Sequence, residues 1–233
     1  MFDISDINNE KIKYGRYTFH TLPDIDSVIY DLEGYTNGEV RRSDYINNKI
    51  IIHLNPLIDE YSIKYQKSIL WHEFTHIFDL INNQKDEYMC TISEFKASFL
   101  EHRYLLSLKN NERLNNINVK IEFMNDKITY IKILEYRYSL MIKYFTNTIK
   151  TGDPNFFKLA INNLMYFCGA LKVMGNNKNT KEIANKLAKQ YPIVIEQQIL
   201  DMIYCVLSNE YEKVIDKYET LSVIVPYIKM NKI

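Results

Sequence analysis

The sequence predicts a mainly helical α+β protein, in which a small N-terminal unit with a short sheet precedes an all-helical C-terminal region. The chain has 233 residues and is 46% hydrophobic, enough to bury a sizeable core. It contains only 6 glycines and 5 prolines, and so few breakers favour long helices over a many-turned β protein. Strand-like patterns are confined to the first sixty residues. We therefore expect one unit over residues 1–110 and a helical domain over residues 119–233.

Charge balance and apolar patterning indicate which partners and which compartment to expect. The 29 basic and 29 acidic residues cancel, which gives no electrostatic reason to expect nucleic acid or an acidic membrane surface. The N-terminus, MFDISD, carries acids where a secretory signal has a basic start and an apolar run. The apolar stretch 164–174 is interrupted by Lys172 and is too short to span a bilayer. A cytoplasmic protein with neither nucleic-acid nor membrane partners is expected.

The first sixty residues read as mixed helix and strand. Residues 13–22 alternate loosely and are rich in aromatic and β-branched side chains, which predicts a strand. Residues 24–32 follow Pro23, and we interpret them as a short helix started by Asp24 or Asp26. Residues 39–43 and 49–55 read as two further strands. The second of these, KIIIHLN, has the clearest strand pattern in the chain, and Pro56 ends it.

From residue 59 the pattern becomes helical. Apolar side chains recur with helical spacing over residues 59–81, and a second helix is expected over residues 92–108. A polar break covers residues 109–118. Further helices are predicted over residues 119–149, 155–174, 179–190, 193–208 and 210–230, some of them separated by glycine- and asparagine-containing turns.

The helix predicted over residues 59–81 contains an HExxH motif. His72 and His76 are four residues apart, so both imidazoles emerge from one face of the helix and can reach one tetrahedral cation. Glu73 would point beside the metal, where it can accept a proton from the attacking water and pass it to the leaving amine. This is the pattern of zinc metalloproteases. The alternative is a helix whose histidines are merely hydrogen-bonded at the edge of the core.

A catalytic zinc site needs a third protein ligand. No glycine and third histidine follow His76 closely, which excludes the metzincin motif. Glu94 is the first candidate, eighteen residues after His76. Glu101 is its rival, seven residues further on the same helix face, whereas His102 turns off that face. Glu94 could instead form a capping box with Thr91.

Two other histidines occur in predicted strands. His53 lies in the strand 49–55 and could approach a substrate, although strand histidines are commonly just half-buried. His20 lies in the strand predicted over residues 13–22 and has the same two interpretations. Neither histidine is part of the HExxH motif.

Residues 49 to about 106 resemble the gluzincin metallopeptidases. His72, Glu73, His76 and Glu94 match that group's motif positions, and the compact size is similar to minimal gluzincins such as the ImmA/IrrE-type peptidases of mobile elements. The resemblance implies a zincin-like fold over residues 1–110. It also implies Zn²⁺ held by His72, His76 and Glu94, with Glu73 as the general base. The strand before the active helix would form the sheet edge that pairs with an extended peptide.

Two functions are compatible with these features. The first is an intracellular zinc metallopeptidase that cleaves a narrow range of peptide or protein substrates, since broad activity in the cytoplasm would be toxic. The second is a non-catalytic zincin-fold protein, an interaction or regulatory module that engages a protein partner through its C-terminal helices. A Glu73→Gln substitution distinguishes them, because only the first function needs this carboxylate.

Overall fold

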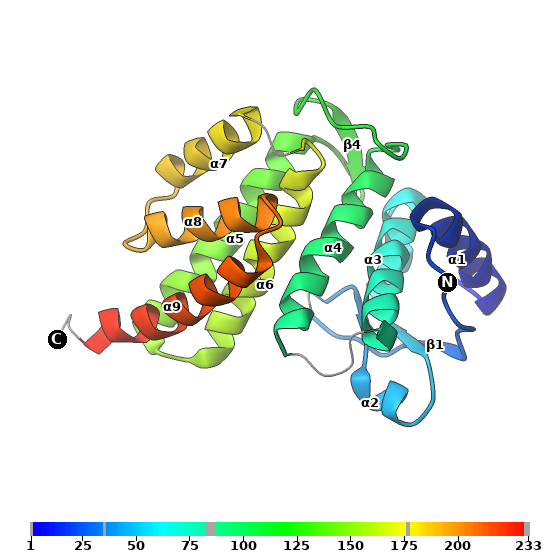
Figure 1. The fold of residues 1–233 in the computed structure, drawn as a ribbon. Helices are drawn as coiled ribbons and strands as arrows, with labels where there is room; N and C mark the ends of the chain where they lie inside the picture. The colour runs from blue at the N-terminus through cyan, green and yellow to red at the C-terminus, as the bar shows by residue number, and fades with distance from the viewer. Residues whose placement is uncertain (1, 35, 83–86, 176–177, 231–233) are drawn as a thin grey trace. The chain divides into compact units, whose positions relative to one another are not determined.

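The computed structural model describes residues 2–34, 36–82, 87–175 and 178–230 (Figure 1). In chain order the elements are α1 (Ile4–Thr18), β1 (Ser27–Tyr30), β2 (Gly38–Val40), α2 (Arg42–Ile46), β3 (Ile51–Leu54), a 3-10 helix η1 (Pro56–Glu60), α3 (Ile63–Asn82), α4 (Glu87–Leu105), β4 (Lys120–Phe123), β5 (Asp126–Thr129), α5 (Tyr130–Thr151), α6 (Pro154–Lys172), α7 (Lys178–Gln190), α8 (Glu196–Leu207) and α9 (Tyr211–Met230). The prediction of a mainly helical α+β protein is confirmed.

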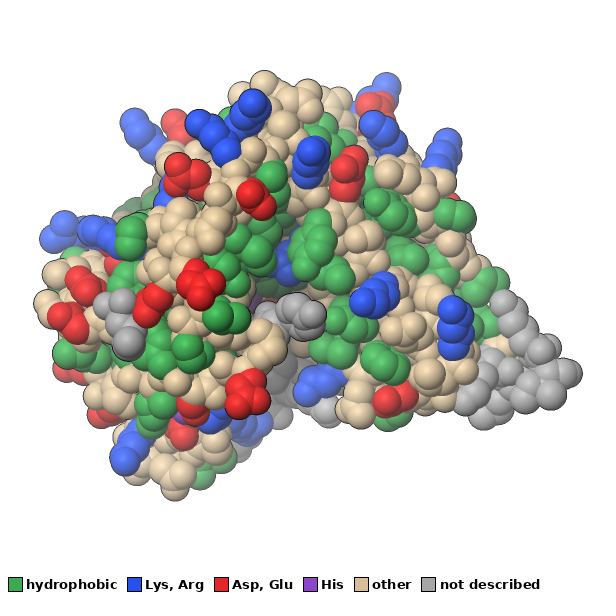
Figure 2. All heavy atoms as spheres, turned by 180° about the vertical axis from the view of Figure 1, so that it is seen from behind, with side chains coloured by type: hydrophobic (Ala, Val, Ile, Leu, Met, Phe, Trp, Pro, Cys, Tyr) green, Lys and Arg blue, Asp and Glu red, His purple; other side chains and the backbone are tan. Residues whose placement is uncertain are grey.

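The chain divides into two compact units. The first comprises residues 1–112 and 119–129, and the second comprises residues 113–118 and 130–233. The first unit contains both sheets and the HExxH helix, whereas helices α5 to α9 make up the second. Basic, acidic and apolar side chains all appear on the face drawn in Figure 2, in keeping with a net charge of zero. Among the described residues, no helix is long and apolar enough to cross a membrane.

The sheet of the first unit has the strand order β1-β3-β2. β3 pairs parallel with β1 and antiparallel with β2, so that Ile52 lies opposite both Val28 and Val40. The prediction that residues 49–55 form a sheet edge is therefore wrong, because β3 is the central strand. Its apolar side chains explain this position, since Ile52 and Leu54 are completely buried. The edge strand that packs against α3 is β2 instead.

The strand predicted over residues 13–22 is wrong, because α1 extends to Thr18. A capping box starts this helix: Asp3 Oδ1 accepts from the backbone N–H of Asp6 at 2.8 Å, and the Asp6 side chain accepts from the N–H of Asp3. Helical spacing then buries Ile7, Glu10 and Tyr14 on one face. Packing of this face therefore overrides the strand propensity of the aromatic and β-branched residues.

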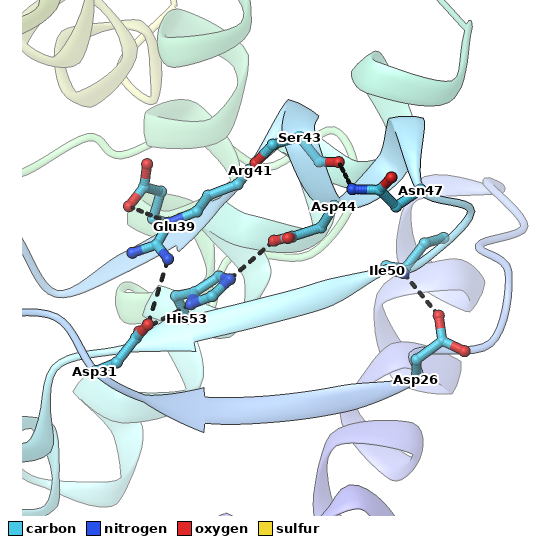
Figure 3. Close-up of polar contacts among 9 residues, drawn as sticks. All are labelled: Asp26, Asp31, Glu39, Arg41, Ser43, Asp44, Asn47, Ile50 and His53. Carbon is cyan, nitrogen blue, oxygen red and sulfur yellow. Dashed lines mark hydrogen bonds and ion pairs between the residues drawn. The ribbon is translucent and has the colours of Figure 1, made fainter.

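The short helix predicted over residues 24–32 is also wrong, because β1 occupies this segment. The backbone N–H of Asp26 donates to the carbonyl of Ile50 at 2.9 Å, and the Asp26 side chain accepts from the N–H of Ile50 at 2.6 Å (Figure 3). Asp26 thus starts the pairing of β1 with β3. The strand predicted over residues 39–43 is confirmed only in its first part, since α2 begins at Arg42.

The helix predicted over residues 119–149 is wrong in its first third. β4 and β5 form a hairpin in which Phe123 lies opposite Asp126, and the loop residue Met124 has a left-handed φ of 55°. The carbonyl of Met124 accepts from the N–H of Ser62 at 3.1 Å, which ties the hairpin to the start of α3. The helix itself starts only at Tyr130.

The remaining helices of the second unit follow the prediction to within about three residues. Asp153 starts α6 by accepting from the N–H of Asn155 at 2.8 Å, and Pro154 occupies the first turn, where its missing N–H is tolerated. α5 and α6 lie side by side (Figure 1). Tyr138 of α5 packs edge-to-face on Phe167 of α6, with 5.2 Å between ring centroids, and both are completely buried.

Candidate metal centre

Helices α3 and α4 carry the candidate site. They lie side by side (Figure 1), with the HExxH motif on α3 and Glu94 on α4. Ala97 and Ser98 of α4 are completely buried, and their small size permits a close approach of the two helices. α4 begins at Glu87, more than a turn before the expected start at residue 92. Thr91 therefore lies inside the helix, which excludes the capping-box interpretation of Glu94.

Three ligand atoms converge between the two helices. The Nε2 atoms of His72 and His76 lie 3.0 Å apart. Glu94 Oε2 lies 3.4 Å from His72 Nε2, and Glu94 Oε1 lies 3.7 Å from His76 Nε2. His72, His76 and Glu94 thus form a group that could hold a metal ion, with their ligand atoms within 4.8 Å of one another.

The second nitrogen of each histidine ring has its own partner. His72 Nδ1 lies 3.0 Å from Glu101 Oε2, and His76 Nδ1 lies 2.8 Å from Ser93 Oγ. A carboxylate accepts from Nδ1–H, which fixes the tautomer and leaves Nε2 as the ligand atom. Glu101 therefore lies behind His72 rather than beside the converging ligand atoms.

The sequence had pointed to Glu101 and His102 as rival third ligands. Both are buried on α4, but neither belongs to the three-residue group found among the described residues. Ser93 was not expected, and only its position next to Glu94 connects it with the motif in the sequence. His76 and Ser93 lie on different helices. Their contact could therefore be recognised only from the packing of α3 against α4.

The two histidines are in different electrostatic environments. Burial lowers the pKa of His72, but its hydrogen bonds to Glu101 and Glu94 outweigh that effect and raise the pKa to about 10. Burial lowers the pKa of His76 to about 4, with the Glu94 charge opposing and the His72 charge adding to this effect. The two Nε2 atoms that lie 3.0 Å apart are thus in environments that shift their pKa values in opposite directions.

Glu73 is held against the edge strand β2. Glu73 is only 3% exposed, and its Oε2 atom has no hydrogen-bond partner among the described residues. Burial raises its pKa to about 8. A Cβ atom at Gly38 would lie 2.6 Å from Glu73 Oε1 and 2.9 Å from Glu73 Cγ, so a side chain at Gly38 would require Glu73 or β2 to shift. A buried carboxylate with an unpaired oxygen is costly and is typical of a functional site.

Gly38 is a residue that the sequence reasoning missed. The Asn37-Gly38 pair indicated only a turn, whereas Gly38 opens β2 and lies opposite Leu54 of β3. A glycine inside a strand often marks a close approach of another group. This feature of the sequence could have identified Gly38 as part of the site.

His53 has a structural position rather than one that approaches a substrate (Figure 3). It is only 3% exposed, and its Nδ1 and Nε2 lie 2.8 Å from Asp31 Oδ1 and 2.9 Å from Asp44 Oδ2. Arg41 in turn pairs with Asp31 at 3.3 Å and with Glu39 at 3.2 Å. Because both ring nitrogens are occupied, His53 joins the central strand β3 to α2 and to the segment that follows β1.

His20 is also explained by packing. It follows α1 rather than lying in a strand, and its ring stacks on that of Phe78 at 3.8 Å between centroids. Burial lowers the pKa of His20, which favours the neutral ring that such stacking accommodates. His20 does not join the ligand group of the described residues.

We compared the chain with protein-family models, curated proteins and solved structures. None of the three comparisons gives a match. A function for this chain therefore has to be inferred from the arrangement of its own side chains.

Proposed function

We propose that the chain is a zinc-dependent metallopeptidase, in which His72, His76 and Glu94 hold the metal and Glu73 is the general base. The observation that carries this proposal is the convergence of three ligand atoms on neighbouring helices. Two imidazoles and one carboxylate are a ligand set of catalytic zinc sites, which use three protein ligands and keep a further position open. Other first-row divalent ions accept the same ligands, and we favour zinc from the HExxH motif.

The residues behind the ligands also fit a divalent cation. Glu101 and Ser93 occupy the Nδ1 atoms, so that both Nε2 atoms face each other, an arrangement that a shared cation stabilises. Glu94 and Glu101 bring two negative charges to the histidines, which balances a dication. Metal binding would require both Nε2 atoms to be unprotonated.

A bound zinc ion would supply Lewis-acid polarisation of a peptide carbonyl and a water of lowered pKa. The chain's own contribution is Glu73. Burial raises the pKa of Glu73 to about 8, close to neutrality, which suits a group that accepts a proton from water and returns it to the leaving amine. Gly38 keeps the space beside this carboxylate clear of any side chain.

The edge strand β2 is the element to which we assign substrate binding. It is paired on one side with β3 and lies at the edge of the three-stranded sheet. An extended peptide can add to such an edge through main-chain hydrogen bonds. A peptide on β2 would run past Gly38 and hence past Glu73. We further propose that the enzyme acts in the cytoplasm on a narrow set of peptide or protein substrates.

The direct test is a search for new N-termini. Zinc-loaded protein and its Glu73→Gln variant would be incubated with a cell lysate, and peptide N-termini would be compared by mass spectrometry. We expect a few cleavages by the wild type and a loss of at least about 100-fold in Glu73→Gln. Glu122→Gln, which removes an exposed carboxylate from β4 of the same unit, is the matched control and should retain activity.

Three outcomes would count against parts of this proposal. Absence of any new N-terminus with zinc-loaded protein would contradict the peptidase function. Cleavage of many unrelated unfolded proteins would contradict the narrow substrate range. A Glu73→Gln protein that keeps its full cellular effect would favour the alternative, a non-catalytic module that acts on a protein partner through its C-terminal helices.

A further inference from the structure

A second concave site lies within the first unit. It is a cavity of about 840 Å³ between α1, α3 and the C-terminal end of α4. This volume is within the range of small-molecule sites. Five of its lining side chains are cationic and none is acidic. The five are Lys13, Arg16, Lys64, Arg103 and Lys109.

Arg103 is the most deeply placed of these cations. It is only 7% exposed, yet among the described residues its guanidinium donates to neutral groups alone: the carbonyl of Glu112 at 2.9 Å, the carbonyl of Lys109 and the hydroxyl of Tyr17. These bonds fix the side chain without neutralising its charge. A buried cation without a counter-ion is unfavourable, and an anion in the cavity would relieve that cost.

The other cations leave the excess of positive charge largely uncompensated. In the part of the chain that the structure describes, only Lys13 of the five forms an ion pair, with Glu10 at 2.7 Å. Glu10 is also shared with Lys67 at 2.8 Å, so this single acid already balances two lysines. Lys64 donates to a neutral acceptor, the Ser107 hydroxyl, at 2.8 Å. The cavity therefore presents a concentrated positive field in a chain whose net charge is zero.

Aromatic rings form another part of the wall. Trp71 packs against Tyr17 and Tyr104, with ring centroids 5.1 and 4.8 Å apart, and all three line the cavity. Trp71 is 5% exposed, and its indole N–H has no hydrogen-bond partner among the described residues. The aromatic rings therefore give the pocket an apolar wall beside its cationic side chains.

We propose that this cavity binds a phosphorylated small molecule that carries a planar ring, which is the chemistry of a nucleotide. The lysines and arginines would bind the phosphates, and the aromatic wall would contact the ring. The Ser107 hydroxyl, which accepts from Lys64, would supply a directional donor. A small molecule is favoured over a nucleic-acid strand because the cations converge on one concavity instead of following a stripe. Trp71 directly precedes the candidate ligand His72 on α3, but the proposal is independent of the metal.

The test uses the fluorescence of Trp71, the single tryptophan of the chain. The full-length protein would be titrated with ATP, inorganic triphosphate and adenosine, both with EDTA and after zinc loading. We expect a saturable fluorescence change with ATP that weakens with added salt. Inorganic triphosphate should bind at least about tenfold more weakly than ATP, and adenosine should not saturate. The ATP signal should persist in EDTA, which separates this test from that of the peptidase function.

Matched variants show whether the cavity is the site. Arg16→Gln combined with Lys64→Gln should weaken ATP binding by at least about tenfold. The control pair, Lys143→Gln with Lys150→Gln on α5, removes the same charge from exposed positions and should leave binding unchanged. Thermal unfolding of both variants would confirm that they are folded. Trp71→Ala, followed by calorimetry, would remove the central ring of the aromatic wall, with weaker binding expected.

Several results would overturn the proposal. Absence of a saturable signal and of calorimetric heat up to ~10 mM ATP would exclude a site of useful affinity. An equal loss in the control pair would show that binding is diffuse. Equal affinity for inorganic triphosphate would exclude a role of the ring. A short single-stranded oligonucleotide that binds more tightly than ATP would point to a nucleic-acid surface instead.

Discussion

The Nδ1 atom of His72 lies 3.0 Å from the Oε2 atom of Glu101, a carboxylate that is almost wholly buried on α4. This contact turns the Nε2 atom of the same ring toward His76 and Glu94. Glu101 is thereby assigned the role of orienting a ligand, and Glu94 that of being one. The two roles make different predictions for metal binding.

Glu101→Gln is expected to weaken zinc binding by about 10- to 100-fold while leaving the stoichiometry intact. Gln keeps the shape of the side chain but replaces a charged acceptor with a neutral one. Glu94→Ala, by comparison, should abolish stable binding because it removes a ligand. Competition with a chromogenic chelator would measure both affinities. The assignment is reversed if Glu94→Ala still binds zinc tightly and Glu101→Gln does not.

Gly38→Ala is expected to impair peptidase activity by at least about tenfold with zinc still bound. The added Cβ would lie 2.6 Å from Glu73 Oε1, so either the carboxylate or β2 has to move. Activity and zinc content of the same preparation would be measured together. Glu122→Ala is the control, at an exposed position on β4 of the same unit. Full activity in Gly38→Ala would mean that Glu73 is not held in this position during catalysis.

Glu10→Gln is expected to lower the free energy of unfolding by about 2 kcal/mol at neutral pH. Burial raises the pKa of Glu10, but its bonds to Lys13 and Lys67 outweigh that and lower the pKa below 4.5. A lowered folded-state pKa stabilises the protein above the unfolded-state pKa, and this contribution is lost as the pH falls through the folded-state value. Urea unfolding of wild type and variant should therefore converge under acidic conditions.

The control for Glu10 is Glu33→Gln, at an exposed position without a hydrogen bond or ion pair among the described residues. It should leave stability within about 0.5 kcal/mol of wild type. A Glu10→Gln penalty that stays constant down to acidic pH would show that packing, and not the ion pairs, sets the effect.

His53→Ala is expected to cost about 2 to 4 kcal/mol of unfolding free energy. The substitution removes two hydrogen bonds to carboxylates and the buried ring that joins β3 to α2. His53→Gln keeps one donor and should cost less. Chemical denaturation would compare the three proteins. Unchanged stability with a loss of peptidase activity would restore the substrate-contacting interpretation of His53.

Much of the ligand set could be predicted from the sequence, because HExxH spacing depends only on helix geometry. His72, Glu73 and His76 occur within one helical turn, so a correct helix assignment suffices to bring them together. Helix geometry alone could not decide between Glu94 and Glu101 as the third ligand. Both lie on the same face of α4, and only the tertiary contact with His72 distinguishes them.

The errors in the fold have a common physical origin. Residues 13–18 have strand-forming side chains, yet the packing of Tyr14 against Trp71 and Phe74 holds them in a helix. The hairpin formed by β4 and β5 was missed because Met124 occupies the first position of its two-residue turn with a left-handed φ, where glycine or asparagine is usual, although Asn125 follows it. The central position of β3 depends on pairing with β1 and β2, and strand order is not encoded in a local pattern.

The most direct test of the proposed metal centre is the zinc content of protein purified without a histidine tag. Elemental analysis would compare the wild type with His76→Ala, Glu94→Ala and Glu73→Gln. We predict about one zinc ion per chain in the wild type and in Glu73→Gln, and almost none in the two ligand variants. A wild-type chain that remains free of zinc after reconstitution, or a His76→Ala protein that retains it, would contradict the account.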